Sequence, residues 1–530
     1  MVGLMVGSSG PERLVKLRGR MNNHRVSSVA IHTSSVQNSV RPMQTSPTLS
    51  AVAKAFLLCF ALTIGSPAGH AAEKLNVLYI VSDDLNTRLA CYGDNLAQTP
   101  NLDRLATQGV RFDRAYCQYP LCSPSRTSFM TGLRPDHNGV VSNSKTFREK
   151  LPDHITLPQS FKQAGWFTAR IGKIFHYAVP AQIGTDGVDD APSWEKVINP
   201  KGRDVTDEEE IFSLRPDLEG ASRFAGTLSW LAAKGTDAEQ TDGMTALATV
   251  KLLEENQSRP FFIAAGFFRP HTPYVAPKKY FDLYPLDKIK LPDALPNVKD
   301  LFPAAALTIR KDQEAMTDTQ RRQAIQAYLA CISFMDAQVG HVLDALDRLK
   351  LHDKTIIVFQ SDHGYHLGEK HLWQKMSLFE QCARVPLIID APGMAQGKTC
   401  SRIVELVSLY PTLTDLCGIK PTVKLDGLSM RPLLQNPSAP WAHPALTQQQ
   451  RGAPQGTFDN GKKPANNGFM GYSLRTDRWR YTEWDEGKKG LELYDHFNDP
   501  QEMKNLADDP SLQKTRDGLK AQLRQLLAHP

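Results

Sequence analysis

Four short apolar runs constrain the fold of this 530-residue chain more than any other feature. Runs this apolar and this short are typical of strands buried on both faces of a parallel sheet. They are Leu75–Val81, Phe261–Ala265, Thr355–Phe359 and Val385–Ile389. The first three are followed closely by Asp or His. Because ligands bind beyond the carboxyl ends of such strands, we expect these side chains to meet at one edge of a sheet.

Helical and strand patterns fill the rest of the chain. Residues 324–349 carry apolar side chains at helical spacing, which predicts a long helix packed on the sheet. The alternation predicts an α/β fold with a large, doubly wound, mixed and mostly parallel sheet. The acidic segment 180–241 predicts a loop-like insertion on the surface. Alternating aromatic residues at 471–476 and 479–484, followed by a helix at 513–527, predict a smaller C-terminal antiparallel α+β subdomain.

Residues 43–72 have the layout of a secretory signal peptide. Lys54 precedes the apolar run 55–62, and small residues around Gly69–Ala72 supply a cleavage site. We therefore expect export to a periplasm or the extracellular space. The run is too short for a permanent membrane anchor, and a buried helix is the alternative. Residues 1–42 are expected to be a leader from an over-extended start, residues 73–435 the main domain and residues 436–530 the C-terminal subdomain.

The charge of the chain gives no support to nucleic-acid binding. The formal net charge is +6, but residues 1–42 hold six basic residues against the single acid Glu12, and Lys54 adds one more base. Residues 73–530 are therefore close to neutral. With 41% hydrophobic and 22% charged residues, the chain has the composition of a soluble globular protein rather than a disordered or multi-span one.

One of the seven cysteines after residue 72 has distinctive neighbours. The seven contain no CxxC pair, so neither a zinc cluster nor a disulfide scaffold is indicated. Cys122 begins a predicted helix, with Ser123 or Ser125 as its cap and Pro124 in the first turn. The helix start and Arg126 are expected to lower the pKa of the thiol. A buried structural cysteine is the alternative.

The pattern Cys122-x-Pro124-x-Arg126, followed by Thr127 and Thr131-Gly132, resembles the type I sulfatase signature of the alkaline phosphatase superfamily. In that family the cysteine is oxidised to formylglycine by a maturation enzyme. Within the family, the chain resembles the iduronate-2-sulfatase branch. The motifs that carry this resemblance are Cys91–Asp94, Gly172–His176, Arg269–Tyr274, Ser361–Glu369, Trp373–Lys375 and residues 469–476.

The resemblance implies a sulfuric ester hydrolase that removes sulfate from a sulfated carbohydrate. It also implies a divalent cation, calcium, held by Asp83, Asp84, Asp362 and His363 together with the oxidised Cys122. Carboxylates are suitable hard ligands for calcium, whereas imidazole is less typical. A lone Asp at a strand end more often forms a turn, but two adjacent acids and a third on another strand favour a metal site.

The same resemblance assigns roles to the remaining residues. Hydrated formylglycine carries two hydroxyls on one carbon, so one can attack sulfur and the other can later expel sulfate. His176 resembles the base of the second step, and His271 resembles the acid that protonates the departing sugar oxygen. Lys173, Lys375 and Arg126 would stabilise the charge near sulfur. Each of these residues alone would more often be an ordinary surface residue.

Five further residues are weaker candidates for the pocket. His366 and His371 lie close to the metal motif in the sequence but could be surface histidines. Tyr92 and Trp373 could form substrate walls or simply pack. Arg269 could bind a substrate carboxylate.

Two other functions remain open. A phosphomonoester or phosphonate hydrolase of the same superfamily could use this scaffold, although the cysteine motif disfavours it. A non-catalytic protein that binds sulfated glycans could keep Cys122 unmodified. Residues 180–241 and 435–466, which would shape the outer pocket, do not closely resemble the iduronate enzymes. The identity of the sugar therefore stays open.

Overall fold

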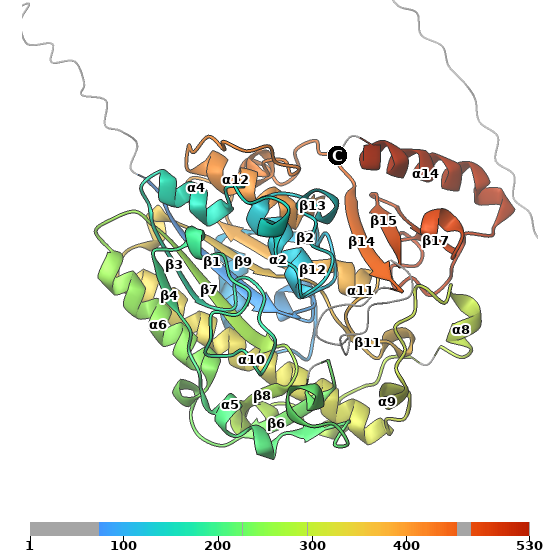
Figure 1. Ribbon diagram of the computed structural model, residues 1–530, viewed down its shortest axis with the longest axis horizontal. Coiled ribbons are helices and arrows are strands. Elements are labelled where there is room, and N and C mark those ends of the chain that lie inside the picture. The colour runs from blue at the N-terminus through green and yellow to red at the C-terminus, as the bar shows by residue number, and fades with distance from the viewer. Residues whose placement is uncertain (1–73, 225, 294, 453–467, 529–530) are drawn as a thin grey trace, which may run out of the picture. The chain divides into compact units, whose positions relative to one another are not determined.

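An eight-stranded sheet lies at the centre of the computed structural model (Figure 1). Its strand order is β13-β2-β12-β9-β1-β7-β3-β4, and β12 runs antiparallel to both of its neighbours. The strands are β1 (Asn76–Asp83), β2 (Val110–Tyr116), β3 (Phe167–Gly172), β4 (Lys196–Ile198), β7 (Phe261–Pro270), β9 (Thr355–Ser361), β12 (Arg384–Asp390) and β13 (Lys398–Glu405). The mixed, mostly parallel sheet is confirmed, and the four apolar runs form β1, β7, β9 and β12.

The structure describes residues 74–528 except 225, 294 and 453–467. The predicted leader and signal peptide lie outside the described residues. One helix in the described part of the chain, α10 (Asp318–Arg348), is long and apolar enough to span a membrane, but 83% of its apolar window is buried inside the protein.

Helices cover both faces of the sheet because successive side chains of a strand point to opposite faces. Leu78 and Ile80 of β1 pack in the cluster that includes α1 (Pro100–Gln108), α6 (Thr241–Asn256) and α10. Val77, Tyr79 and Val81 pack in the cluster that includes α2 (Cys122–Thr131), α4 (Leu157–Gln163) and α12 (Leu409–Leu416). The predicted helix at 324–349 is thus confirmed as part of α10, and the three-layer arrangement is visible in Figure 1.

The prediction for residues 180–241 was wrong in part. This segment contains β4, which extends the main sheet, and two strands of a small three-stranded sheet. That sheet consists of β5 (Phe212–Ser213), β6 (Ser229–Ala233) and β8 (Tyr274–Pro277). Ile211, Phe224 and Leu228 are buried, so the segment contributes to the core and is not a surface loop throughout. Its strands are two to five residues long, too short for an alternating pattern to identify them.

The C-terminal antiparallel sheet is confirmed. It consists of β14 (Ala445–Arg451), β15 (Phe469–Arg475), β16 (Trp479–Trp484) and β17 (Leu491–Asp495) in sequence order. Leu519 and Leu523 of α14 (Gln513–Ala528) pack on one face of it. β14 lies within residues 435–466, which were expected to shape the outer pocket, and it was not predicted as a strand.

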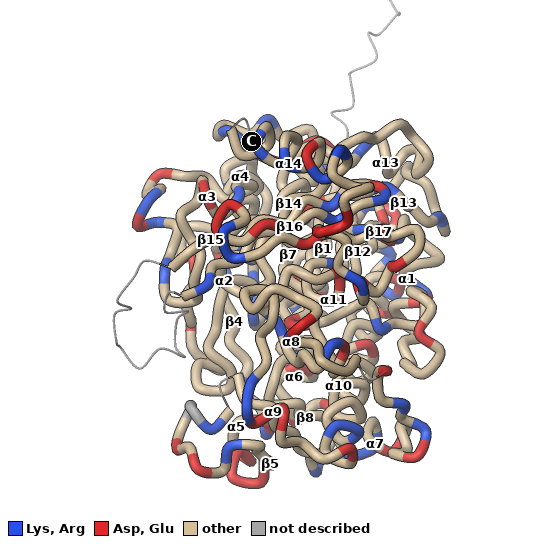
Figure 2. Tube along the Cα trace, turned by 90° about the vertical axis from the view of Figure 1, so that its right-hand side faces the viewer, with Lys and Arg blue, Asp and Glu red and all other residues tan. Residues whose placement is uncertain are grey.

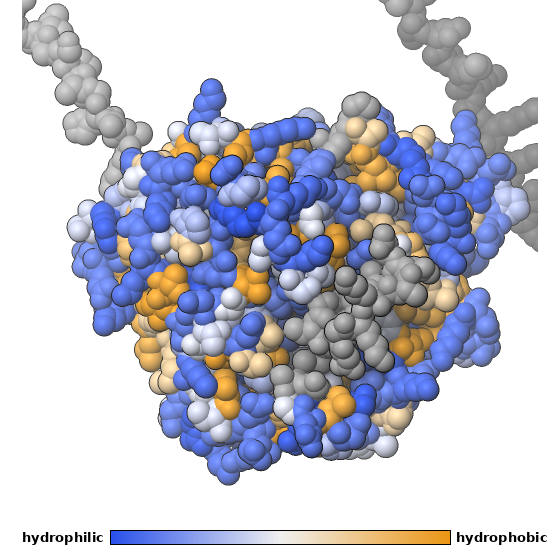
Figure 3. Space-filling view, viewed as in Figure 1, coloured by the Kyte–Doolittle hydropathy of each residue, from blue (hydrophilic) through white to orange (hydrophobic). Residues whose placement is uncertain are grey.

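Short elements complete the fold and its surface. A two-stranded ribbon pairs β10 (His366–Leu367) with β11 (Trp373–Gln374). The short helices are α3 (Pro135–Asn138), α5 (Arg203–Thr206), α7 (Lys278–Phe281), α8 (Val298–Leu301), α9 (Lys311–Glu314), α11 (Glu380–Ala383) and α13 (Arg431–Gln435). Basic and acidic residues are interspersed along the described chain in Figure 2, and hydrophobic side chains form small separate patches on the face in Figure 3. This mixture agrees with the near-neutral charge of residues 73–530.

Candidate active site

The acids meet at the carboxyl edge of two neighbouring strands. β1 and β9 are parallel and in register at Ser82 and Ser361, so the residues that follow each strand lie side by side. The Asp84 backbone N–H donates to the Asp362 carboxylate over 3.1 Å. Asp84 itself has φ of 64°, a left-handed conformation that is costly outside glycine and is often found at functional sites. The prediction that these acids lie together at one edge of the sheet is confirmed.

Cys122 enters the same site from the first residue of α2. The N-cap is Leu121, and no side chain caps the helix, so the prediction of Ser123 or Ser125 as cap was wrong. The Ser123 N–H instead donates to the Asn143 side chain over 3.0 Å. The Ser125 hydroxyl donates to the Asp362 backbone carbonyl over 2.5 Å. These bonds fix the start of α2 against the strand edge and aim the cysteine at the acids.

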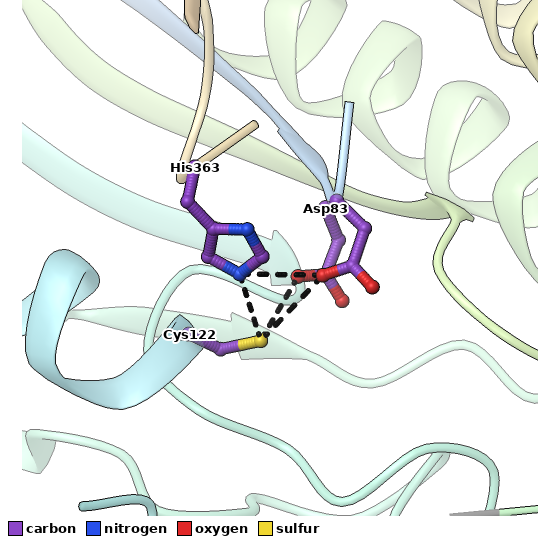
Figure 4. Close-up of side chains that lie close together, drawn as sticks. Asp83, Cys122 and His363 are labelled. Carbon is purple, nitrogen blue, oxygen red and sulfur yellow. Dashed lines mark hydrogen bonds and ion pairs between the residues drawn. The ribbon is translucent and has the colours of Figure 1, made fainter. Parts of the chain in front are cut away.

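Asp83, Cys122 and His363 point toward one another in Figure 4. The Cys122 sulfur lies 3.5 Å from the Asp83 carboxylate and 3.5 Å from His363 Nε2. Burial and then the charge of Asp83 raise the pKa of the thiol above its ordinary value of 9.0. The predicted lowering of this pKa was therefore wrong for the unmodified cysteine, because burial and acid neighbours outweigh the helix start and the nearby cations.

Arg126 joins two of the acids from within the same helix. Its guanidinium contacts Asp83 at 3.0 Å and Asp362 at 2.9 Å, and all three side chains are fully buried. It also donates to the backbone carbonyl of Lys173 over 2.6 Å. With both carboxylates and this carbonyl as partners, Arg126 positions the acids and has few donors left for a substrate.

Two lysine amines lie within 4.0 Å of the cysteine sulfur. Lys173, directly after β3, contacts Asp83 at 2.5 Å and lies 4.0 Å from the Cys122 sulfur. Lys375, directly after β11, contacts Asp84 at 2.6 Å and lies 3.2 Å from that sulfur. Burial opposes the charge of Lys375, but Asp84 raises the pKa of its amine above the ordinary value. The Lys375 amine is thus positively charged where an anion would approach residue 122.

Lys375 is held by an unusual stretch of backbone. Its two neighbours, Gln374 and Met376, have φ of 69° and 76°, in the left-handed region. The Met376 N–H donates to the Pro120 carbonyl over 3.1 Å. The Gln374 side chain accepts a hydrogen bond from Gln313 over 3.0 Å. These contacts hold the strained turn that points Lys375 toward the cysteine.

Two histidines complete the group. His271, directly after β7, lies 3.8 Å from the Asp84 carboxylate, and its Nδ1 is 2.5 Å from the Thr272 carbonyl. His176 follows β3, and its buried Nδ1 has no hydrogen-bond partner among the described residues. Burial, together with nearby lysines, lowers the pKa of both imidazoles. Both rings are therefore neutral at neutral pH when no anion is bound.

Lys375, His176 and His271 of this group line a cavity of about 420 Å³, a size typical of small-molecule sites. Its lining residues are Asn143, His176, Tyr177, Ala178, Val179, Gly226, His271, Thr272, Leu307, Thr308, Ile309, Arg310, Trp373, Gln374, Lys375, Met376 and Arg451. Lys375 and the two histidines therefore share this cavity with residues 307–310 and the end of β14.

The donor set fits a divalent cation. Ligand atoms of Asp83, Asp84, Cys122 and His363 all lie within 4.8 Å of one another, and Asp362 lies 3.6 Å from His363 Nε2. His363 Nδ1 is 3.0 Å from the Gly364 carbonyl, a contact that orients Nε2 toward the cluster. Three buried carboxylates at this spacing repel one another and are the ligands that a hard cation prefers.

Comparison with known proteins identifies the family. The family model described as "Sulfatase" matches residues 75–419, and that described as "N-sulphoglucosamine sulphohydrolase, C-terminal" matches residues 368–529. The chain belongs to the sulfatase family. This sulfatase is 34% identical over 502 residues to iduronate 2-sulfatase of Mus musculus, covering 80% of this chain and 87% of that relative. It is 31% identical over 453 residues to choline-sulfatase of Rhizobium meliloti, covering 82% and 83%.

A solved structure supports the fold. The crystal structure of phosphonate monoester hydrolase of Agrobacterium radiobacter matches with a TM-score of 0.69 and 23% identity, covering 86% of this chain and 96% of that chain. The identity is low, so this match supports only the alkaline-phosphatase-type fold. Family membership makes this sulfatase a sulfuric ester hydrolase with a sulfated substrate.

The structure separates the weaker candidates of this sulfatase. Trp373 lines the cavity. Tyr92 packs instead, with its hydroxyl bonded to the Phe112 and Leu387 carbonyls. His366 is fully buried against Ser377, and His371 is exposed. Arg269 does not face the cavity.

Arg269 has a structural role that its motif does not reveal. It is 1% exposed, its guanidinium pairs with Asp204, and it donates to the Val275 carbonyl over 2.8 Å. The suggestion that it binds a substrate carboxylate was wrong, because Asp204 in the supposed surface segment already supplies its counter-charge.

Sequence reasoning missed Asn143, Arg310 and Arg451, which all line the cavity. Arg451 ends an unpredicted strand, and Arg310 lies between helices with no motif around it. No local pattern marks either arginine as part of the site, because each reaches it only through long-range packing.

Proposed function

We propose that this sulfatase removes sulfate from a sulfated carbohydrate by way of formylglycine at position 122 and a calcium ion. The observation that carries the proposal is the convergence of residue 122 with three carboxylates and two lysines, beside a cavity lined by Lys375, His176 and His271. Asp83, Asp84, Asp362 and His363 would hold the calcium, and residue 122 would complete its ligands. A hydrated aldehyde at residue 122 would supply the nucleophile, and calcium would supply positive charge beside it.

The chain's own residues provide the rest of the chemistry. Lys375 and Lys173 lie 3.2 and 4.0 Å from the sulfur that marks the nucleophile's position, so their amines bind sulfate oxygens and stabilise charge as it develops there. Arg126 keeps Asp83 and Asp362 in place through its contacts with both carboxylates. A 1 Å shift of such groups would be costly, because they act through fixed geometry.

The histidines differ in the task that their position allows. His271 lies beside Asp84 at the cavity wall and would give a proton to the departing sugar oxygen. The negative charge of a bound sulfate ester favours the protonated ring and counters the effect of burial on its pKa. His176 is neutral in the free site and would accept the proton of the second hydroxyl, allowing sulfate to leave.

Export and domain layout form part of the proposal. We infer that residues 43–72 direct export and are removed, that residues 73–435 form the catalytic domain and residues 436–530 the C-terminal subdomain. A formylglycine-generating maturation enzyme would be a transient partner. Carbohydrate as the substrate class is supported by the similarity to iduronate 2-sulfatase, whereas the similarity to choline-sulfatase marks the rival class of small sulfate esters.

Mass spectrometry of the tryptic peptide of residues 115–126 from the native host tests the nucleophile. Conversion of Cys122 to formylglycine makes this peptide about 18 Da lighter, and fragmentation separates Cys122 from Cys117. The expected result is that deficit at Cys122. An unmodified thiol in the native host would reject the mechanism and favour a protein that only binds sulfated glycans.

A panel of esters tests the reaction. We expect at least one sulfated sugar to be hydrolysed with a higher kcat/KM than an aryl sulfate, and all of them faster than the matched phosphate esters. Faster hydrolysis of phosphate or phosphonate esters would favour the rival superfamily activity.

A further inference from the structure

Arg451 is a basic side chain in the cavity wall that the mechanism leaves unused. It is the last residue of β14, it is partly buried, and it lines the same cavity as Lys375 and His271. Its guanidinium lies over the ring of the fully buried Trp484, 4.9 Å from the ring centroid. Trp484 thus holds the planar guanidinium in one orientation in the cavity wall.

The guanidinium has donors left over. Nε donates to the Ala305 carbonyl over 2.9 Å, Nη2 to the Met376 carbonyl over 2.6 Å, and Nη1 to the Gln450 carbonyl over 3.4 Å. An arginine has five N–H groups, so these three bonds leave one on each terminal nitrogen. These two N–H groups, one on each terminal nitrogen, are available to donate to the oxygens of an oxyanion.

Arg451 also lacks the counter-charge that its neighbours have. Lys375 pairs with Asp84 at 2.6 Å, and Arg310 lies 3.5 Å from Asp312. No carboxylate lies within ion-pair distance of Arg451 among residues 74–528 outside 225, 294 and 453–467. Burial, only partly countered by distant groups, lowers its pKa to about 10. Arg451 is thus a cation in the wall of a cavity, and its hydrogen-bond partners are carbonyls. Because burying such a charge is unfavourable, the site is suited to a ligand that carries negative charge.

We propose that Arg451 binds a second anionic group on the sugar whose sulfate ester lies at Lys375, either a carboxylate or a second sulfate. This inference rests on the proposed function and specifies its substrate as a sugar with two anionic groups. Arg451 is then a specificity residue rather than part of the sulfate chemistry. The same positive charge disfavours a cationic alcohol such as choline in the leaving-group position.

A competing explanation is that Arg451 only positions Lys375. Its bond to the Met376 carbonyl lies one residue from Lys375, so losing the side chain could move that lysine. A positioning role would lower kcat for every substrate alike. A binding role would raise KM for substrates that carry the second anion and spare those that lack it.

The test compares Arg451→Gln and Arg451→Lys with the wild-type enzyme on three hexosides sulfated at the same position. One carries a carboxylate at carbon 6, one is reduced there to a neutral hydroxymethyl group, and one carries a second sulfate there. Arg451→Gln is expected to lower kcat/KM for a charged substrate about 10- to 100-fold, mainly through KM, the range for losing a hydrogen bond to a charged group. The value for the neutral sugar is expected to change less than about twofold. Arg451→Lys keeps the charge but loses the planar guanidinium. Its kcat/KM for a charged substrate is expected to lie between those of the wild-type enzyme and Arg451→Gln.

The two charged sugars distinguish the sources of the anion. A loss confined to the uronoside identifies a carboxylate site, and a loss confined to the disulfated sugar identifies a second sulfate site. Because each ratio of charged to neutral substrate is measured on one preparation, a smaller folded fraction cannot produce the effect. Arg348→Gln is the matched control, since its ion pair with Glu254 is exposed, and its ratios are expected to equal those of the wild-type enzyme.

Equal losses on all three sugars, or no loss on any, would overturn the binding role of Arg451. A wild-type enzyme that hydrolyses none of these sugars but does hydrolyse an aryl sulfate would overturn both this inference and the carbohydrate proposal. Inactivity toward every sulfate ester would reject the proposed mechanism itself, a result that differs from an unchanged substrate ratio.

Discussion

The described part of the chain contains two buried clusters, each of which combines acidic and basic side chains. The two clusters use similar residues in different ways. The first is the active-site cluster around Cys122. The second, here called the C-terminal ion cluster, joins Glu380 of α11, Arg480 of β16 and Glu502. Arg480 Nε contacts Glu502 at 2.5 Å, and its guanidinium also pairs with Glu380. Both clusters bring three or more potential metal-ligating side chains within 4.8 Å of one another.

The difference lies in how the carboxylate oxygens are satisfied. In the C-terminal ion cluster, Glu380 accepts from Tyr116 over 2.9 Å and from Arg480, and Glu502 accepts from Arg480, from His496 over 2.8 Å and from a backbone N–H over 2.8 Å. Every oxygen of both glutamates has a partner. In the active-site cluster the acids contact the Arg126 guanidinium, two lysine amines and the Cys122 thiol. Buried charge beside a cavity therefore does not by itself indicate catalysis, since Glu380 and His496 also line one. What the active-site cluster adds is a thiol held among carboxylates and lysine amines.

The largest expected effect separates the clusters by activity. Cys122→Ala removes the side chain that becomes the nucleophile, so kcat is expected to fall at least about 10⁴-fold. Its free energy of unfolding is expected to stay within about 1 kcal/mol of the wild-type value. Kinetics with a sulfate ester and urea denaturation provide the two measurements. Retention of even 1% of wild-type kcat would contradict the assignment of Cys122.

Arg480→Gln is expected to have the opposite profile. It leaves two buried carboxylates without their cation, which costs about 3–5 kcal/mol of unfolding free energy, while kcat of the folded enzyme stays within about twofold. Arg478→Gln is the control, because Arg478 is an exposed arginine just before β16 that pairs with Asp495, and it should cost less than about 1 kcal/mol. Similar losses for the two variants would remove the distinction between buried and exposed arginines.

The loss of unfolding free energy caused by Arg480→Gln should be smaller at acidic pH. Burial opposes ionisation, but arginines hold the pKa of Glu380 and of Glu502 below the ordinary value of 4.5. The stability that these lowered values contribute is complete above pH 4.5 and is lost as the pH falls below it. The gap in unfolding free energy between the wild-type protein and Arg480→Gln is therefore expected to shrink between pH 5 and pH 2. A gap that stays constant over that range would show that the pairing contributes no linkage.

Calcium should distinguish the clusters as metal sites. At 100 times its dissociation constant, a bound ion stabilises the folded state by about 2.7 kcal/mol. Calcium added after chelation is expected to raise the melting temperature of the wild-type protein and of Glu502→Gln, but not that of Asp84→Asn. Loss of the shift in Glu502→Gln with its retention in Asp84→Asn would place the ion in the C-terminal ion cluster.

The smallest expected effect tests which residue contributes most to the stability of the C-terminal ion cluster. Tyr116→Phe removes the hydrogen bond to Glu380 and leaves one carboxylate oxygen without its donor, which is expected to cost about 1–2 kcal/mol. Activity should be unchanged. Chemical denaturation beside the Arg480→Gln variant ranks the two contributions, and a cost for Tyr116→Phe as large as that for Arg480→Gln would show that the cluster is not centred on the arginine.

Much of the fold and the site could be predicted from local patterns. The four apolar runs, the helix at 324–349 and the acids after β1 and β9 follow from periodicity and from the topology of parallel sheets. Arg451 and the partner of Arg269 could not be predicted, because both depend on contacts between segments far apart in the chain. The pKa of Cys122 was predicted in the wrong direction because burial, which the sequence does not show, outweighs the helix start.

The left-handed turn around Lys375 has a consequence for protein engineering. A left-handed residue other than glycine costs about 1–2 kcal/mol, and Gln374 and Met376 both have this conformation. Glycine at either position would relieve that cost and leave the lysine free to sample other directions. Selection for thermal stability alone would therefore favour glycine at these two positions. The resulting loss of a fixed Lys375 would lower kcat. Gln374 and Met376 should therefore be kept unchanged when this sulfatase is engineered for stability.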